Sequence, residues 1–261
     1  MSDSRKSLER EKIQAAGFVV QSKVEDDPST FVILDDWASR GHLLGNQTWG
    51  DADLNELEPD HFYEHLRDGQ KYLRTISRAH PINYRFLRFP NLHEGDTRKK
   101  KKRIRKILER GNYRVATVSV KTAGNFFNRP FVIAQRKYPE KLDLLREKYI
   151  GHIQTSLDYA EKQSQIVFGK NISHVLQLHM GVATAMMITS LIEALKSRGY
   201  HFISMIEALD DPAYSRPEKY VGPLGLTFTD RVAATEGLPF HENSGVNPKI
   251  LEEELENLLE K

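Results

Sequence analysis

The sequence predicts an α/β fold in which helices cover a largely parallel sheet. Short apolar segments of strand type alternate with longer segments that carry apolar residues at helical spacing. A chain of 261 residues is long enough for one large α/β domain. Neither an internal repeat nor a low-complexity linker interrupts the alternation. We therefore interpret residues 1–261 as a single domain.

Helices and strands alternate through the first half of the chain. Gly17 and Gly41 mark predicted helix ends, because glycine is common just after the last helical turn. Phe62, Leu66 and Leu73 give a third helix its apolar stripe. The predicted elements of this half are helix 4–16, strand 18–20, helix 29–40, strand 43–46, helix 59–79, strand 84–89, helix 96–110 and strand 113–120.

The same alternation continues in the second half, which ends in an amphipathic helix. Asn247 is a suitable N-cap for that helix, and Pro248 suits its first position. Residues 210–244 are rich in loop formers and are predicted to form an irregular cap. The predicted elements of this half are helix 139–167, strand 175–178, helix 183–198, strand 202–205 and helix 248–261.

Four polar side chains fall at or just after the ends of predicted strands. They are Gln47, Arg88, Lys121 and His179. In folds of this kind functional residues lie at the carboxyl ends of the strands. These side chains are therefore the first candidates for a site.

The composition excludes several classes of function. The hydrophobic fraction is 39% and the charged fraction 28%, as in globular proteins, and the net charge of +2 does not favour nucleic acid as a partner of the whole molecule. The chain has no cysteine, so disulfides and thiolate metal sites are excluded. No segment has the roughly 20 apolar residues of a membrane span. Residues 1–12 lack the apolar stretch of a signal peptide, so a cytoplasmic location is expected.

Five segments, in order along the chain, form a recognisable set. The strongest reads Gly-His-Leu-Leu-Gly-Asn-Gln-Thr-Trp-Gly-Asp and begins at Gly41. The other four segments are Phe-Leu-Arg-Phe-Pro-Asn-Leu-His-Glu-Gly at 86–95, Gly-Asn-Tyr-Arg-Val-Ala at 111–116, Leu-His at 178–179, and residues 198–214. Together they resemble the polysaccharide deacetylase family, which includes chitooligosaccharide and peptidoglycan deacetylases. The resemblance covers about residues 13–235, which leaves residues 236–261 as a tail with a helix.

The resemblance implies a distorted, incomplete (β/α) barrel and metal-dependent hydrolysis of sugar acetamides or esters. In the family, a Thr-Phe-Asp-Asp motif on the first strand supplies a general base and one ligand of a divalent metal such as zinc. A His-x-x-x-His loop supplies the other two ligands. The metal polarises the carbonyl and lowers the pKa of its bound water. The first strand is expected to be missing here, because the sequence begins at what resembles the helix that follows it.

The chemical residues of the family are largely replaced. Gln47 and Asp51 stand where the family has its two histidine ligands, and Lys121 and Gly124 replace the two acids of the fourth segment. A carboxamide oxygen is a poor zinc ligand, and catalytic zinc needs three protein ligands. We therefore expect no metal cofactor. Asp51 is interpreted as a surface or capping residue.

Two residues match functional positions of the family. His179 corresponds to its general acid and Arg88 to the arginine that orients its base, so both are interpreted as vestigial catalytic residues. For His179 a hydrogen-bonded histidine at a strand end remains the simpler interpretation. Buried charges demand partners. We therefore expect Asp51 or Glu94 to pair with Arg88.

Trp49 and Pro90 are the candidates for substrate contact, with an acetylated glycan as the expected partner. Trp49, Phe126 and Phe127 could stack on sugar rings, although packing in the core or rim explains them as well. The acidic pair at residues 35–36 fits a solvated helix end better than a replacement for the acidic motif of the missing strand.

The basic run at residues 98–106 is interpreted as the solvated face of a helix. Ile104, Ile107 and Leu108 would turn the opposite face into the core, and no aromatic residues interleave with the basic ones to stack on bases. Nucleic acid is therefore not an expected partner. His61 and His65 lie four residues apart, but a solvated helix face is favoured over a metal site.

These observations leave two main hypotheses for function. The first is a relative that has lost metal-dependent deacetylation and binds glycan or is vestigial. The alternative is an active hydrolase of acetylated polysaccharide with a rebuilt site that uses Asp51 and His179. A weaker third is a basic module that binds polyanions through residues 99–106. Loss of a central strand would expose sheet edges, so self-association into a homo-oligomer is expected.

Overall fold

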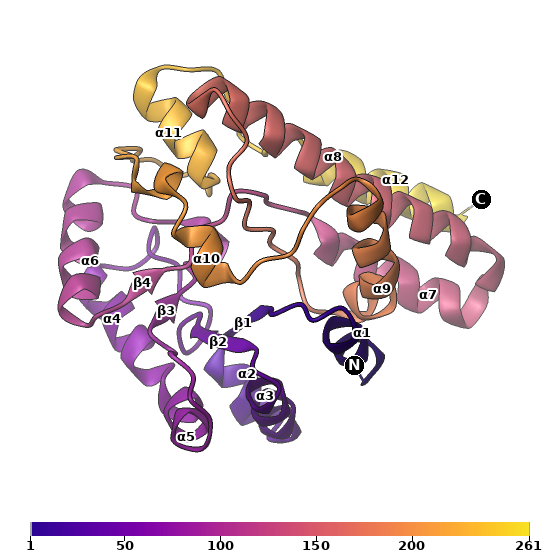
Figure 1. The fold of residues 1–261 in the computed structure, drawn as a ribbon, viewed down its shortest axis with the longest axis horizontal. Coiled ribbons are helices and arrows are strands. Elements are labelled where there is room, and N and C mark those ends of the chain that lie inside the picture. Colours follow the sequence, from indigo (N-terminus) through magenta and orange to yellow (C-terminus); the bar gives the residue numbers. More distant parts are fainter. Residues whose placement is uncertain (1, 261) are drawn as a thin grey trace.

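The computed structural model describes residues 2–260, and the side chains of residues 6–259. Its centre is a parallel four-stranded sheet in the order β1-β2-β3-β4 (Figure 1). A parallel β-bridge between Val120 and Leu176 lies outside these four strands. At one edge of the sheet lies β1, and no described strand pairs with its second edge. The strands are β1 (Ala16–Val19), β2 (Leu43–Asn46), β3 (Phe86–Leu87) and β4 (Arg114–Val115).

The strand order follows the chain order, and helices surround the sheet, which confirms the predicted α/β class and the incomplete barrel. Short 3-10 turns lie at Pro90–Leu92 (η1), Gly124–Phe127 (η2), Pro139–Lys141 (η3) and Pro212–Ser215 (η4). The helices are α1 (Ser2–Arg10), α2 (Gln21–Asp26), α3 (Ser29–Ser39), α4 (Pro59–Asp68), α5 (Lys71–Ala79), α6 (Arg98–Arg110), α7 (Asn128–Lys137), α8 (Leu142–Phe168), α9 (Val182–Ser197), α10 (Met205–Leu209), α11 (Phe228–Glu236) and α12 (Pro248–Glu260).

The largest buried cluster lies among α7, α8, α9 and α12, on the right of Figure 1. Phe131, Tyr149 and Leu191 are at most 1% exposed. Leu255 of α12 joins the same cluster, so the amphipathic C-terminal helix packs into the domain. A second cluster fills the space between the sheet and α4 and α6, around Phe62. The sheet therefore stands between two packed groups of helices.

Several predicted helices are confirmed with small shifts of their ends. They are α3, α6, α8, α9 and α12, for the last of which Lys261 lies outside the described residues. The first predicted helix is shorter than expected and ends at Arg10. None of the helices among residues 2–260 combines the length and apolar character that crossing a bilayer requires.

The single helix predicted for residues 59–79 is wrong, because the chain breaks it into α4 and α5 at Gly69. A Cβ on Gly69 would lie 2.7 Å from Oδ1 of Asn46 and 2.7 Å from the carbonyl carbon of Thr48. Asn46 also donates from Nδ2 to the carbonyl of Leu66 at 2.8 Å. The helix end therefore presses against the end of β2, and only glycine fits there.

The strand predicted for residues 202–205 is also wrong. Phe202 and Ile203 are 36% and 47% exposed, and no sheet partner lies beside them in the described chain. Ser204 instead caps α10 in a reciprocal pair with Glu207. The strand predicted for residues 175–178 is reduced to the bridge at Leu176.

Four helices of the described residues were not predicted, namely α2, α7, α10 and α11. Helix α7 covers Asn128–Lys137, with Pro130 in its first turn. Within residues 210–244, which were expected to be irregular, α11 begins at Phe228, and the hydroxyl of Thr227 caps it by accepting from the backbone N–H of Asp230. The residue after the last turn, Gly237, has φ of 70°.

Candidate functional site

The candidate residues gather where β2, β3 and the Val120–Leu176 bridge end. Gln47 directly follows β2, and Arg88 directly follows β3. Lys121 and His179 follow the two sides of the bridge. Because parallel strands end at the same edge of the sheet, the structure brings the four sequence-predicted residues to one side of the domain.

The two positions that resemble the family's metal ligands bind each other. Nε2 of Gln47 donates to Oδ1 of Asp51 at 2.9 Å, and Asp51 is exposed. The loop shape between them is fixed by neighbouring polar groups. Oδ1 of Asn46 accepts from the backbone N–H of Thr48 at 2.7 Å, and Oγ1 of Thr48 accepts from the N–H of Ala52 at 2.8 Å. The family-like loop is thus held by hydrogen bonds among its own residues.

Arg88 is a buried cation without an acidic partner. Its side chain lies over the ring of Phe18 with 4.6 Å between the guanidinium carbon and the ring centroid, and its Nε has no hydrogen-bond partner. The residue is 6% exposed. Burial lowers its pKa to about 9, against a small opposing effect of Tyr214.

The expectation that Asp51 or Glu94 pairs with Arg88 is wrong. Asp51 accepts from Gln47. Oε1 of Glu94 lies 2.9 Å from a guanidinium nitrogen of Arg231, which is itself buried. No other acid of the described residues forms an ion pair with Arg88.

Lys121 and His179 add to the positive character of this region. Nζ of Lys121 donates to the carbonyl of Gly225 at 3.0 Å. Burial lowers its pKa, which the charge of Asp230 partly opposes. Burial also lowers the pKa of His179, and the charges of Lys121 and Arg88 lower it further. The neutral imidazole is therefore favoured, which is the wrong form for a general acid.

The donor groups at these positions do not fit a divalent metal. Gln47 presents an amide that is already bonded, Asp51 is a single carboxylate, and Arg88 and Lys121 repel a cation. Within residues 2–260 no three His, Asp or Glu side chains are arranged to hold a metal ion. His61 is exposed, and the ring of His65 packs near that of Trp49 at 6.2 Å.

Of the residues considered for sugar contact, Trp49 presents its side chain most openly. It is 40% exposed, and its Nε1 donates to Oε2 of Glu25 at 2.9 Å. Pro90 is buried at the start of η1. Phe127 lies in the core with 0% exposure, and Phe126 packs against the same cluster.

Not all basic side chains of helix α6 face solvent. Ile104, Ile107 and Leu108 are buried as predicted. Lys101 is buried too, and its Nζ lies 2.6 Å from Oε2 of Glu218. Nζ of Lys100 donates to the carbonyl of Asn55 at 2.7 Å. The expectation that every basic side chain faces solvent is therefore wrong for these two lysines.

The family resemblance agrees with a comparison of the sequence with family models. Residues 5–116 match the sequence model of the family described as polysaccharide deacetylase. Over these residues the sequence resembles a polysaccharide deacetylase domain. The match includes Gln47, Asp51 and Arg88, and ends before Lys121 and His179. No curated protein matches the chain.

Solved structures of polysaccharide deacetylases share the fold. Peptidoglycan deacetylase PdaC from Bacillus subtilis is 17% identical with a TM-score of 0.52, over 79% of this chain and 81% of that one. Polysaccharide deacetylase Bc1974 from Bacillus cereus is 14% identical with a TM-score of 0.52, over 78% and 84%. A mutant of BA3943, described as a CE4 family pseudoenzyme with restored enzymatic activity, is 16% identical with a TM-score of 0.50, over 78% and 60%.

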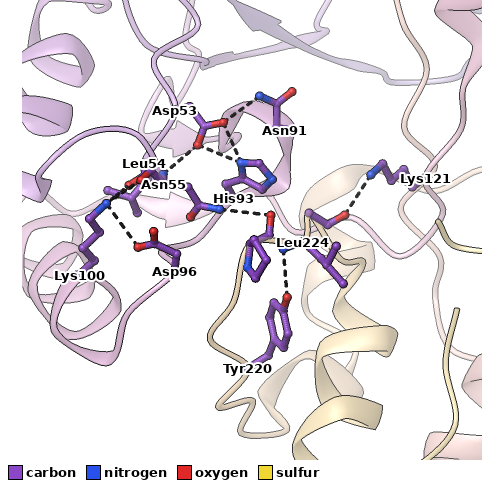
Figure 2. Close-up of polar contacts among 12 residues, drawn as sticks. Asp53, Leu54, Asn55, Asn91, His93, Asp96, Lys100, Lys121, Tyr220 and Leu224 are labelled. Atoms are coloured by element: carbon purple, nitrogen blue, oxygen red, sulfur yellow. Dashed lines mark hydrogen bonds and ion pairs between the residues drawn. The ribbon is translucent and has the colours of Figure 1, made fainter. Parts of the chain in front are cut away.

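The structure also forms an Asp–His pair that sequence reasoning missed (Figure 2). Nδ1 of His93 lies 2.7 Å from Oδ2 of Asp53. Nδ2 of Asn91 donates to Oδ2 at 3.0 Å, and the backbone N–H of Asn55 donates to Oδ1 at 2.8 Å. Burial alone would raise the pKa of Asp53, but the hydrogen bonds from Asn91, Asn55 and His93 hold it below its usual value.

The backbone that carries this pair is strained. Asn91 and Leu92 have φ of 53° and 59°, a region that non-glycine residues rarely occupy. The hydrogen bond to Asp53 places the proton of neutral His93 on Nδ1, which leaves Nε2 as a proton acceptor. Nδ1 of His179 is buried without a hydrogen-bond partner, which is not the case for Nε2 of His93. The sequence signal was two spaced polar pairs, Asp53-x-Asn55 and Asn91-x-His93.

A segment at residues 220–225 covers one side of the pair (Figure 2). The carbonyl of Pro223 accepts from Asn55, and the backbone N–H of Leu224 donates to the hydroxyl of Tyr220. A Cβ on Gly225 would lie 1.8 Å from the carbonyl oxygen of Asn91 and 3.4 Å from Cδ2 of His93. Glycine is therefore required for this close approach.

Proposed function

We propose that this chain is a polysaccharide deacetylase-family protein that has lost metal-dependent deacetylation and binds glycan without hydrolysing it. The proposal rests on the positive charge at the candidate site. Arg88 and Lys121 are buried or half-buried cations there, and neither forms an ion pair with a described acid. A hydrolytic metal needs the opposite environment.

Physical chemistry supports this choice. Catalytic zinc uses three protein ligands and keeps one position open for water. Gln47 and Asp51 satisfy each other, and the cationic surroundings oppose a divalent ion. A solved structure of similar fold is described as that of a pseudoenzyme mutant whose activity was restored. That description supports the idea that this fold persists when its activity is lost.

The test measures metal and product together. The purified chain is incubated with zinc, cobalt or nickel, freed of unbound ions and analysed for metal, and acetate release from chitooligosaccharides is followed. We expect much less than one metal per chain and no acetate above the protein-free control. Stoichiometric metal accompanied by turnover would overturn the proposal.

A second candidate is an active hydrolase of acetylated polysaccharide with a rebuilt site. The Asp53–His93 pair favours it, because Nε2 of His93 can accept a proton. Asp51, which sequence reasoning assigned to such a site, is instead bonded to Gln47. The same acetate assay separates the two candidate functions when it is run with a chelator present, on the wild type and on the variants His93→Gln and His179→Gln. Acetate release that survives the chelator and disappears in one variant would favour the hydrolase.

A further inference from the structure

An open groove of about 560 Å³ lies beside Trp49, between α2, the loop after β2 and the junction of α4 and α5. We propose that this groove binds an acidic oligosaccharide, one whose sugar rings carry carboxylates. The inference rests on the glycan-binding role proposed above and adds the class of glycan. It stands on one exposed aromatic ring and on an excess of positive charge.

The ring of Trp49 is held in place and still open to solvent. Its Nε1 donates to Oε2 of Glu25 at 2.9 Å, and its backbone N–H donates to the carbonyl of His65 at 2.9 Å. The ring of His65 supports it at a centroid distance of 6.2 Å. A fixed indole that remains 40% exposed offers an apolar face on which the C–H face of a sugar ring can pack.

A row of cations follows Trp49 along the groove. Lys71, Arg74 and Arg78 occupy positions i, i+3 and i+7 of α5, so they share one helix face, while Leu73 and Ile76 are buried in the core. With a rise of about 1.5 Å per residue, the row spans about 10 Å. That length exceeds one sugar ring, which favours an oligosaccharide over a monosaccharide.

The charges of the groove do not cancel. Its walls carry four basic side chains and two acidic ones. Arg67 pairs with Asp68 at 3.0 Å, and Lys71 lies 3.5 Å from Glu25. The remaining two cations are left in excess.

These two cations have no acidic partner in the described part of the chain. The guanidinium of Arg74 donates to the neutral Oε1 of Gln70 at 3.2 and 2.9 Å, which orients it without cancelling its charge. Arg78 lines the groove without an ion pair to any described acid. Guanidinium groups bind carboxylates through two parallel hydrogen bonds, so a carboxylate on the ligand complements both residues.

The experiment uses the fluorescence of Trp49 in the full chain. The sequence has two tryptophans, and Nε1 of Trp37 is bonded to the carbonyl of Leu43 at 3.0 Å, away from the groove. Oligogalacturonate is titrated against a chitooligosaccharide of the same length. We expect a saturable change in fluorescence with oligogalacturonate that weakens as salt is raised and is absent in Trp49→Phe.

A matched pair of double variants tests the charges. Arg74→Gln with Arg78→Gln removes the two exposed groove cations that have no acidic partner among the described residues, and Lys99→Gln with Lys102→Gln removes two exposed cations from α6. We expect the groove variant to bind oligogalacturonate about tenfold more weakly, which corresponds to about 1.4 kcal/mol. The α6 variant should bind as the wild type does.

Equal affinity for the acidic and the neutral oligomer would overturn the inference while leaving the proposed glycan-binding role intact. An equal loss in both double variants would also overturn it, because nonspecific charge would then explain the binding. Tighter binding of a single-stranded oligonucleotide would assign the groove to a different ligand class. The acetate and metal assays test the loss of catalysis separately, so their outcome does not depend on the outcome of this binding experiment.

Discussion

Nζ of Lys101 and Oε2 of Glu218 lie 2.6 Å apart, with 7% and 6% of their side chains exposed. The same carboxylate pairs with Arg105, and Nε of Arg231 lies 3.7 Å away. Nζ of Lys101 also donates to the carbonyl of Tyr220 at 2.7 Å. One buried acid therefore compensates several cations and ties α6 to the segment before α11.

Replacement of Glu218 by glutamine should destabilise the fold. Lys101 would lose its only acidic partner among the described residues, and breaking a buried pair in this way costs about 3–5 kcal/mol. Since Arg231 keeps Glu94, we expect the lower end of this range. Urea unfolding measures the change. Asp143→Asn, which removes an exposed partner of Arg146, is the control and should change stability by about 0.5 kcal/mol or less.

The same carboxylate should make stability depend on acid pH. Burial alone would raise the pKa of Glu218, but Arg231, Lys101 and Arg105 together lower it below the ordinary 4.5. A lowered carboxyl pKa contributes stability that is fully present above the unfolded pKa and is lost as pH falls through the folded pKa. The difference in unfolding free energy between wild type and Glu218→Gln should therefore shrink below about pH 4.5. A difference that stays constant down to pH 3 would contradict this.

Burial lowers the pKa of Lys101 even though Glu218 faces it. The two directions are consistent, because several cations surround the carboxylate, whereas burial outweighs the attraction of Glu218 and Glu94 for the ammonium. The net gain from this pair is therefore carried by Glu218, which is why the acid is the better residue to replace.

Replacement of Arg88 by methionine should leave stability unchanged or raise it by about 1–3 kcal/mol, because a buried charge without a partner is removed. A base whose folded pKa is lowered, here to about 9, destabilises the fold below that pKa. Stability then rises with pH once the folded state begins to lose this proton. The advantage of Arg88→Met should thus be larger at pH 7 than at pH 10. Strong destabilisation at pH 7 would show that Arg88 has a compensating partner.

Asp53 should control the tautomer of His93. In the wild type, nitrogen NMR should place the proton of neutral His93 on Nδ1, because Asp53 accepts from it. Asp53→Asn should weaken this preference and lower stability by about 1–3 kcal/mol, since one of the two oxygens that accept from Asn91, Asn55 and His93 becomes an N–H donor. Asp60→Asn, at an exposed pair with Arg103, is the matched control. A wild-type Nε2–H tautomer would refute the assignment.

The second edge of β1 should favour self-association. No described strand pairs with this edge, and unpaired strand edges are templates for pairing with another chain. Sedimentation velocity should show a sedimentation coefficient that rises with protein concentration. A monomer at all concentrations, with a cooperative melt at high temperature, would contradict this prediction.

Local sequence patterns predicted the elements whose signals are strong. Helix α9 has a clear apolar stripe and ends before Gly199, and β2 is a short apolar segment between Gly41 and the polar loop, so both were found nearly to the residue. Helix α7 was missed because Pro130 interrupts its pattern and the aromatic residues before it suggested a rim. The break at Gly69 depends on contact with Asn46, a distant residue that periodicity does not register.

The candidate site was predictable in position but not in its interactions. The ends of β2 and β3 follow from the order of the elements, so Gln47 and Arg88 were placed correctly. Their partners depend on competition between side chains that are distant in sequence. Glu94 is bound by Arg231, which lies 137 positions later, and a search for a partner of Arg88 along the sequence cannot detect that competition.

The ion cluster around Glu218 bears on how the chain can be divided. Residues 5–116 match the family on their own, yet Lys101 and Arg105 lie inside that stretch and their acid lies outside it. A fragment cut after Ala116 would place an uncompensated ammonium against bare apolar surface. Such a piece should collapse or aggregate, so residues 5–116 are not expected to form a stable unit without the rest of the chain.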